Sequence, residues 1–78
     1  MIQFVTPKPT PEDVADLKKR VKRLTSKAGQ MKMDLHDLAE GLPTDYEKLI
    51  DEATKTYEIY QQLAELKQQL KTWEEQLQ

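Results

Sequence analysis

The sequence contains no cysteine, one histidine and only two glycines. Without cysteine, neither disulfide bonds nor a thiolate metal site can stabilise the fold, which fits a reducing cytoplasm. The glycines form no phosphate-binding loop, and neighbouring carboxylates such as Asp51 and Glu52 are typical of a solvated helix face. The sequence therefore predicts a protein that is not an enzyme.

Long hydrophobic runs are also absent, and no apolar stretch approaches the length that a membrane crossing needs. The opening residues, MIQFVTPKP, lack the basic flank and apolar stretch of a secretory signal. A formal net charge of −2 at pH 7 creates no global field that would attract nucleic acid. We expect a cytoplasmic protein with no membrane partner.

The chain has 78 residues, of which 33% are charged, and this composition favours one helical domain. A chain this short buries only about 60% of the surface that its unfolded form exposes. With no disulfide available, a second chain is the expected source of the missing stability.

Residues 1–10 form a predicted extended, proline-rich tail, because proline removes backbone donors and disfavours the helical conformation before it. Thr10 is the expected N-cap of a first helix, and Pro11 occupies its first position. Glu12 and Asp13 then face the positive end of the helix dipole. These signals predict a helix over about residues 11–40.

A short turn over residues 41–44 follows. Gly41 is expected to end the first helix in the left-handed conformation, and Pro43 prevents the helix from resuming. Thr44 and Glu47 have the spacing of a capping box, which predicts a second helix over about residues 45–76. So short a connection folds two helices back antiparallel.

Apolar residues alternate in steps of three and four along both helices, which predicts a heptad seam. The seam of the first helix contains Val14, Leu17, Val21, Leu24, Ala28, Met31, Leu35 and Leu38, and that of the second contains Ile59, Leu63, Leu66, Leu70, Trp73 and Leu77. The fold is therefore expected to be all-α, an antiparallel two-helix hairpin.

Near the turn, both helices carry more apolar residues than one neighbouring helix can cover. A glycine in mid-helix, Gly29, costs about 1 kcal/mol relative to alanine and suggests close approach by another backbone. We expect the hairpin to dimerise there into a partial four-helix bundle. The predicted interface consists of Gly29, Met33, His36, Leu49, Ile50, Ala53, Tyr57 and Tyr60.

Seven lysines and arginines, and no acidic residue, lie between residues 18 and 32. A dimer could present two such stretches to phosphates. Alternatively, their stems cover apolar edges while their charges pair with the glutamates of the second helix, namely Glu58, Glu65, Glu74 or Glu75. No aromatic residues interleave with the basic ones, which argues against nucleic-acid binding.

His36 lies within the predicted interface, so a nearby twofold axis would place two imidazoles beside one metal ion. Glu40, four residues further on, shares its helix face, whereas Asp37 points about 100° away. From the residues alone, a hydrogen bond from His36 across the interface is the simpler interpretation.

The segments MKMDLHDLAEGLP (31–43) and TDYEKLIDEATKTYEIYQQL (44–63) resemble the small Rop-like proteins encoded in bacterial and cyanobacterial nitrogen-fixation gene clusters. This resemblance spans both helices and the turn and is weakest in the tail and at the end of the second helix. It implies a dimeric hairpin in the cytoplasm with an accessory role in nitrogen fixation, and hence a partner protein from that process.

The resemblance also implies a metal at His36, whose position matches the histidine of the family's H-D-L-A segment. Members of the family are described as binding metal through this side chain from both protomers. The implied cofactor is a divalent transition metal ion (nickel, iron or zinc), with Glu40 as the neighbouring ligand. The alternative function is a helical-bundle scaffold or an RNA-binding Rop-like dimer with no metal role.

Overall fold

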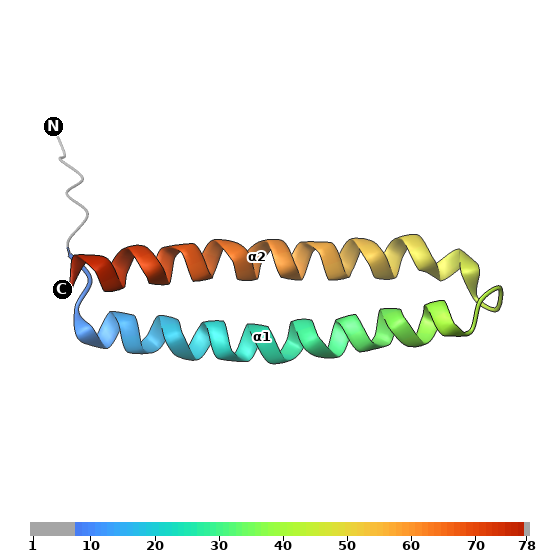
Figure 1. The fold of residues 1–78 in the computed structure, drawn as a ribbon, viewed down its shortest axis with the longest axis horizontal. Coiled ribbons are helices and arrows are strands. Elements are labelled where there is room, and N and C mark those ends of the chain that lie inside the picture. The colour runs from blue at the N-terminus through green and yellow to red at the C-terminus, as the bar shows by residue number, and fades with distance from the viewer. Residues whose placement is uncertain (1–7, 78) are drawn as a thin grey trace, which may run out of the picture.

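The protein is represented by a computed structural model that describes residues 8–77. Its elements are α1 (Pro11–Glu40), the short 3-10 helix η1 (Tyr46–Lys48) and α2 (Leu49–Gln76), with no strand in the described range. The two long helices lie side by side and antiparallel, joined by the turn at one end (Figure 1). The predicted all-α helical hairpin is confirmed. Residues 1–7 of the expected tail lie outside the described residues.

The start of α1 is fixed by a reciprocal pair of hydrogen bonds. The Thr10 hydroxyl accepts from the Asp13 backbone N–H at 3.1 Å, and the Asp13 carboxylate accepts from the Thr10 backbone N–H at 2.9 Å. Pro11 occupies the first turn, where its missing N–H costs nothing. Thr10 is therefore the N-cap that the sequence pattern indicates, with Asp13 completing a capping box.

The turn is built differently from the expectation. Gly41 has a right-handed φ of −85°, and the left-handed residue is Asp45, with φ of 57°. The Thr44 N–H donates to the Gly41 carbonyl and the Lys48 N–H to the Asp45 carbonyl, both at 3.0 Å. Thr44 thus lies inside a series of turns and is not the N-cap of a helix. The left-handed Gly41 and the Thr44–Glu47 capping box are wrong predictions.

The core is one seam between α1 and α2. Its fully buried apolar residues are Val14, Leu17, Ala28, Ile59 and Leu63. Ala28 is 0% exposed and packs with Ile59 and Leu63, and Val21, Leu24 and Met31 lie against this cluster. All belong to the heptad seams read from the sequence, and Trp73 is half-buried further along the α2 seam.

Burial is uneven along the hairpin, because no described residue between positions 29 and 58 is fully buried. In this part of α2 the seam positions after Leu49 are occupied by Glu52 and Thr56, which are half-buried. The Thr56 hydroxyl donates to the Glu52 carbonyl of its own helix at 2.8 Å. Polar side chains therefore replace aliphatic ones on the α2 side of the seam between positions 49 and 58, and the core is thin there.

Neither long helix of the described part is apolar over enough of its length to cross a membrane.

Candidate functional site

Exposed apolar side chains gather in the half of the hairpin nearest the turn. Met33 is 60% exposed, Ile50 78% and Tyr57 68%, and Tyr46 and Tyr60 are exposed as well. Each large apolar side chain stabilises a fold by about 1.5–3 kcal/mol when it becomes fully buried. Exposed apolar side chains grouped in one region are typical of an interaction surface.

These side chains follow one side of each helix. Met33 and His36 lie three residues apart on α1, and Ala53, Tyr57 and Tyr60 follow steps of four and three on α2. We call the eight residues predicted as an interface the turn-proximal face. Of these, Gly29 and Leu49 are half-buried and the other six are exposed in the single chain.

Gly29 has open space beside it, because an added Cβ would meet no atom within 4 Å. Helix α2 of the same chain therefore does not approach Gly29 closely. Close approach by a second chain stays a prediction.

His36 lies on the turn-proximal face with two carboxylates near its ring. Its Nε2 atom is 3.2 Å from Oε1 of Glu40, and its Nδ1 atom is 3.8 Å from Oδ1 of Asp37. The expectation that Glu40 shares the face of His36 agrees with this geometry. The expectation that Asp37 points away is too simple, because the imidazole of His36, which is 67% exposed, can lean over the helix surface toward both residues.

No group of three or more metal-ligating side chains gathers in residues 8–77. One chain offers the His36 imidazole and the Glu40 carboxylate, which are donor types that zinc, nickel and iron accept. A single hairpin therefore supplies an incomplete coordination shell, and a symmetry-related second hairpin would double both donors.

The basic stretch forms one of the ion pairs that the sequence suggests. Lys18 Nζ lies 3.4 Å from Oε2 of Glu74 and joins the start of α1 to the end of α2. Both side chains are about half exposed, so the pair contributes at most about 1 kcal/mol.

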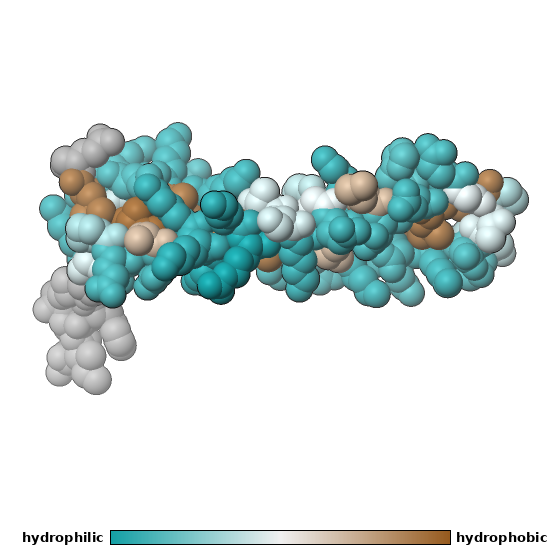
Figure 2. All heavy atoms as spheres, turned by 90° about the horizontal axis from the view of Figure 1, so that it is seen from below, coloured by the Kyte–Doolittle hydropathy of each residue, from teal (hydrophilic) through white to brown (hydrophobic). Residues whose placement is uncertain are grey.

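Viewed from the α1 side, mostly hydrophilic residues occupy the middle of the molecule and hydrophobic ones gather toward its ends (Figure 2).

Two surface hollows between the helices are not evident from the sequence pattern. Both are lined by Lys27 of α1 and Gln62 of α2. Residues nine positions apart project from opposite sides of an α-helix. His36 and Lys27 have this spacing on α1, and Ala53 and Gln62 have it on α2. The hollows and the turn-proximal face thus lie on opposite faces of the hairpin.

The chain is similar to several small proteins. A "UPF0437 protein" from Nostoc sp. (strain PCC 7120) is 67% identical over 61 residues, covering 78% of this chain and 86% of that protein. A Frankia alni protein named "UPF0437 protein in nifX-nifW intergenic region" is 48% identical over 52 residues, covering 67% of this chain and 63% of that protein.

A crystal structure of a DUF683-family protein from the cyanobacterium Cyanothece 51142 is 70% identical to this chain and superposes with a TM-score of 0.84. The match covers 86% of this chain and 94% of that one. The sequence profile described as Rop-like matches residues 12–75, which include the turn and all but one residue of each long helix. The chain therefore belongs to the Rop-like family.

Proposed function

We propose that this protein is a cytoplasmic, non-enzymatic accessory protein of nitrogen fixation that dimerises and binds a divalent transition metal ion through His36 of both protomers. The link to nitrogen fixation is supported by the name of the Frankia alni relative, which places that protein in a nifX–nifW intergenic region. A component of the same process is the proposed protein partner.

Dimerisation is supported by the distribution of apolar surface. No residue between positions 29 and 58 is fully buried, yet Met33, Ile50 and Tyr57 are exposed there. A second hairpin related by a twofold axis would cover the same residues on both chains at once. The dimer would then complete the core that the polar seam residues Glu52 and Thr56 leave thin.

Metal binding is supported by one observation above all, the His36–Glu40 pair on the turn-proximal face. A twofold axis near His36 would bring two imidazoles and two carboxylates to one ion, with water completing the shell. So few protein ligands would hold nickel, iron or zinc exchangeably.

The proposal is tested by titrating the ¹⁵N-labelled protein with Zn²⁺ and Ni²⁺ while its NMR spectrum is recorded. Resonances of His36 and its neighbours should shift with Zn²⁺ and broaden with Ni²⁺, and His36→Ala should abolish both responses. Asp37→Asn is the matched control, because it removes a charge beside the same ring and should leave metal binding in place.

Sedimentation should show that His36→Ala remains a dimer, because the interface depends on apolar burial. Unchanged metal affinity in His36→Ala would disprove the metal site. Steeply salt-dependent RNA binding without a metal response would favour the RNA-binding alternative.

A further inference from the structure

The two hollows join into one groove between α1 and α2. Each has a volume of about 230 Å³, and both are lined by Leu24, Lys27 and Gln62. The first extends along α1 to Arg20 and the second to Met31, a span of roughly 16 Å of helix. We call this joint surface the basic groove.

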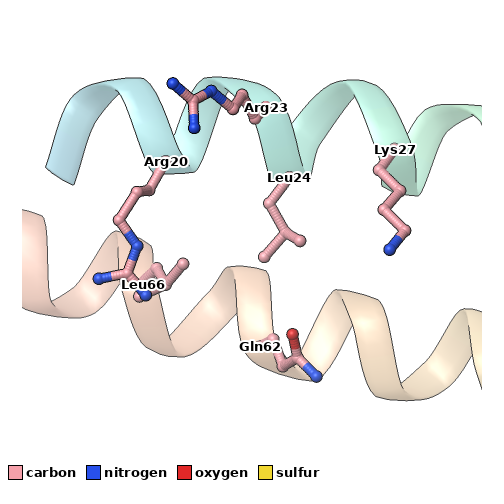
Figure 3. A pocket seen from close by; sticks show the side chains of 6 residues that line it. All are labelled: Arg20, Arg23, Leu24, Lys27, Gln62 and Leu66. Atoms are coloured by element: carbon pink, nitrogen blue, oxygen red, sulfur yellow. The ribbon is translucent and has the colours of Figure 1, made fainter. Parts of the chain in front are cut away.

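The basic groove has an apolar floor and a cationic rim. Leu24 and Leu66 project between the helices, while the guanidinium of Arg20 reaches across toward Leu66 (Figure 3). Lys27 also extends toward α2, and Arg23 lies outward along α1 (Figure 3). Ile59 and Met31 continue the apolar floor into the second hollow.

The facing part of α2 neutralises this rim only in part. Glu58 and Lys55 line the second hollow, so one acid faces the four cations of the two linings, Arg20, Arg23, Lys27 and Lys55. Beyond Glu58, residues 59–71 contain one acid, Glu65, against two lysines and four glutamines. Paired heptad helices commonly carry opposite charges at the positions that flank their seam. The glutamines of α2 carry no charge that could pair with the cations of α1. Lys18 pairs with Glu74, and Lys55 pairs with Glu52. Among residues 8–77, no ion pair involves Arg20, Arg23 or Lys27.

We propose that the basic groove binds an acidic amphipathic helix of a partner protein. An amphipathic helix places an apolar row in a groove and its flanking side chains on the rim, and about three turns of helix match the length available. Its glutamates or aspartates would pair with Arg20, Arg23 and Lys27, and its apolar row would cover Leu24 and Leu66.

Other anions fit this surface less well. Free phosphate would satisfy the cations but leave the apolar floor in contact with water. Single-stranded nucleic acid gains affinity by stacking its bases on aromatic side chains, and no aromatic residue lines either hollow.

This inference does not rest on the proposed metal-binding dimer. Lys27 and His36 lie on opposite sides of α1, so the basic groove stays open when a second hairpin covers the turn-proximal face. A dimer would instead present two basic grooves on its outer surfaces. Evidence against the dimer or the metal site would therefore not count against the basic groove, and evidence against the groove would not count against the dimer or the metal site.

The probe is a synthetic peptide of about fourteen residues, with leucines at helical i, i+3, i+4 and i+7 spacing and glutamates at the flanking positions. Titrated into the full-length ¹⁵N-labelled protein, it should shift the amide signals of Leu24, Lys27, Gln62 and Leu66. Two control peptides, one with lysine for glutamate and one with serine for leucine, should each bind at least about tenfold more weakly.

Two charge reversals on α1 form a matched pair. Lys27→Glu changes the rim, whereas Lys19→Glu makes the same change at an exposed lysine that lines neither hollow. Lys27→Glu should weaken peptide binding about fivefold to tenfold, and Lys19→Glu less than about twofold. Gln62→Glu places an acid among the cations and should also weaken binding. Circular dichroism checks that each variant keeps its helices.

Equal losses from Lys27→Glu and Lys19→Glu would mean attraction by overall charge and would overturn the proposal. Equal binding of the serine peptide would refute the apolar floor. Tighter, Lys27-dependent binding of a uridine-rich RNA oligonucleotide than of the acidic peptide would assign the groove to RNA instead.

Discussion

Thr10 and Asp13 each accept a hydrogen bond from the other's backbone, so a single pair of side chains closes the first turn of α1. The second half of the hairpin begins without such a device. Asp45 before η1 and Lys48 before α2 provide no side-chain capping bond. The two helices are thus anchored unequally, and the start of α1 carries stabilisation that α2 lacks.

Thr10→Ala should lower the free energy of unfolding by about 1 kcal/mol, because the Asp13 N–H loses its acceptor. Urea unfolding followed by circular dichroism measures the change. Thr25→Ala is the control, since that hydroxyl only donates to the Val21 carbonyl of its own helix. Alanine is the better helix former there, so a comparable loss at Thr25 would contradict the special role of the cap.

The conformation of the turn leads to a prediction that differs from the usual one for a glycine after a helix, which is that its replacement destabilises the fold. Gly41→Ala should be neutral or stabilising by up to about 1 kcal/mol, because Gly41 has a right-handed φ of −85°. An added Cβ at this position would meet only ordinary contacts at 3.7 Å. Asp45→Val should be destabilising by about 1–2 kcal/mol, because a β-branched residue resists the left-handed conformation. Thermal unfolding of both variants checks the order, and the reverse order would restore Gly41 as the left-handed residue.

Ala28 is the most deeply buried residue of the seam. Ala28→Leu should destabilise the fold by about 1–3 kcal/mol, because this residue is 0% exposed and packs with Ile59 and Leu63. Denaturant unfolding measures the loss. Leu35→Met, at a half-buried position nearer the turn, is a volume-conserving control that should cost less than about 1.5 kcal/mol. An Ala28→Leu variant of unchanged stability would show that the seam is not closely packed there.

Gly29 should separate the stability of the chain from that of the dimer. Gly29→Ala adds helix propensity of about 1 kcal/mol in a single chain, where no atom lies within 4 Å of the new Cβ. A second backbone packed closely against Gly29 would be pushed away by the same methyl group. We expect the helix to become more stable and the dimer to dissociate more readily in sedimentation experiments. Strengthened association would refute the close approach.

Tyr57→Asp should shift the dimer to monomer at micromolar concentration. A charge placed in a desolvated apolar interface costs several kcal/mol, whereas on the exposed surface of a single chain it costs little. Leu49→Asp should act in the same direction. Gln68→Asp changes an exposed residue of α2 outside the turn-proximal face and should leave association unchanged. A dimer unaffected by Tyr57→Asp would contradict the proposed interface.

The hairpin itself could be predicted because its signals are periodic and redundant. Ala28, Ile59 and Leu63 fall on apolar seams whose spacing repeats along α1 and along the later part of α2, so no single residue decides the fold. The N-cap role of Thr10 could be predicted equally well, since an N-cap depends on neighbours only three residues away.

The turn and the groove could not be predicted in the same way. Gly41 and Asp45 can both adopt left-handed backbone conformations, and the closure of two packed helices determines which of them does so. The basic groove depends on which side chains of α2 face Lys27, a register that no local pattern specifies. His36 could be singled out as the one histidine of the sequence, within the predicted interface beside the heptad seam, but the approach of Asp37 to its ring depends on side-chain conformation.

With the proposed dimer, the thin core between residues 29 and 58 should make order in that part of the chain depend on protein concentration. In a dilute sample, amide protons near the turn should exchange rapidly with solvent, although the covalent connection lies there, while those around Ala28 and Leu63 stay protected. As the concentration rises, association should slow exchange near the turn first and raise the melting temperature. The proposal thus assigns the greatest gain in stability on association to the end of the hairpin where the chain already connects the two helices.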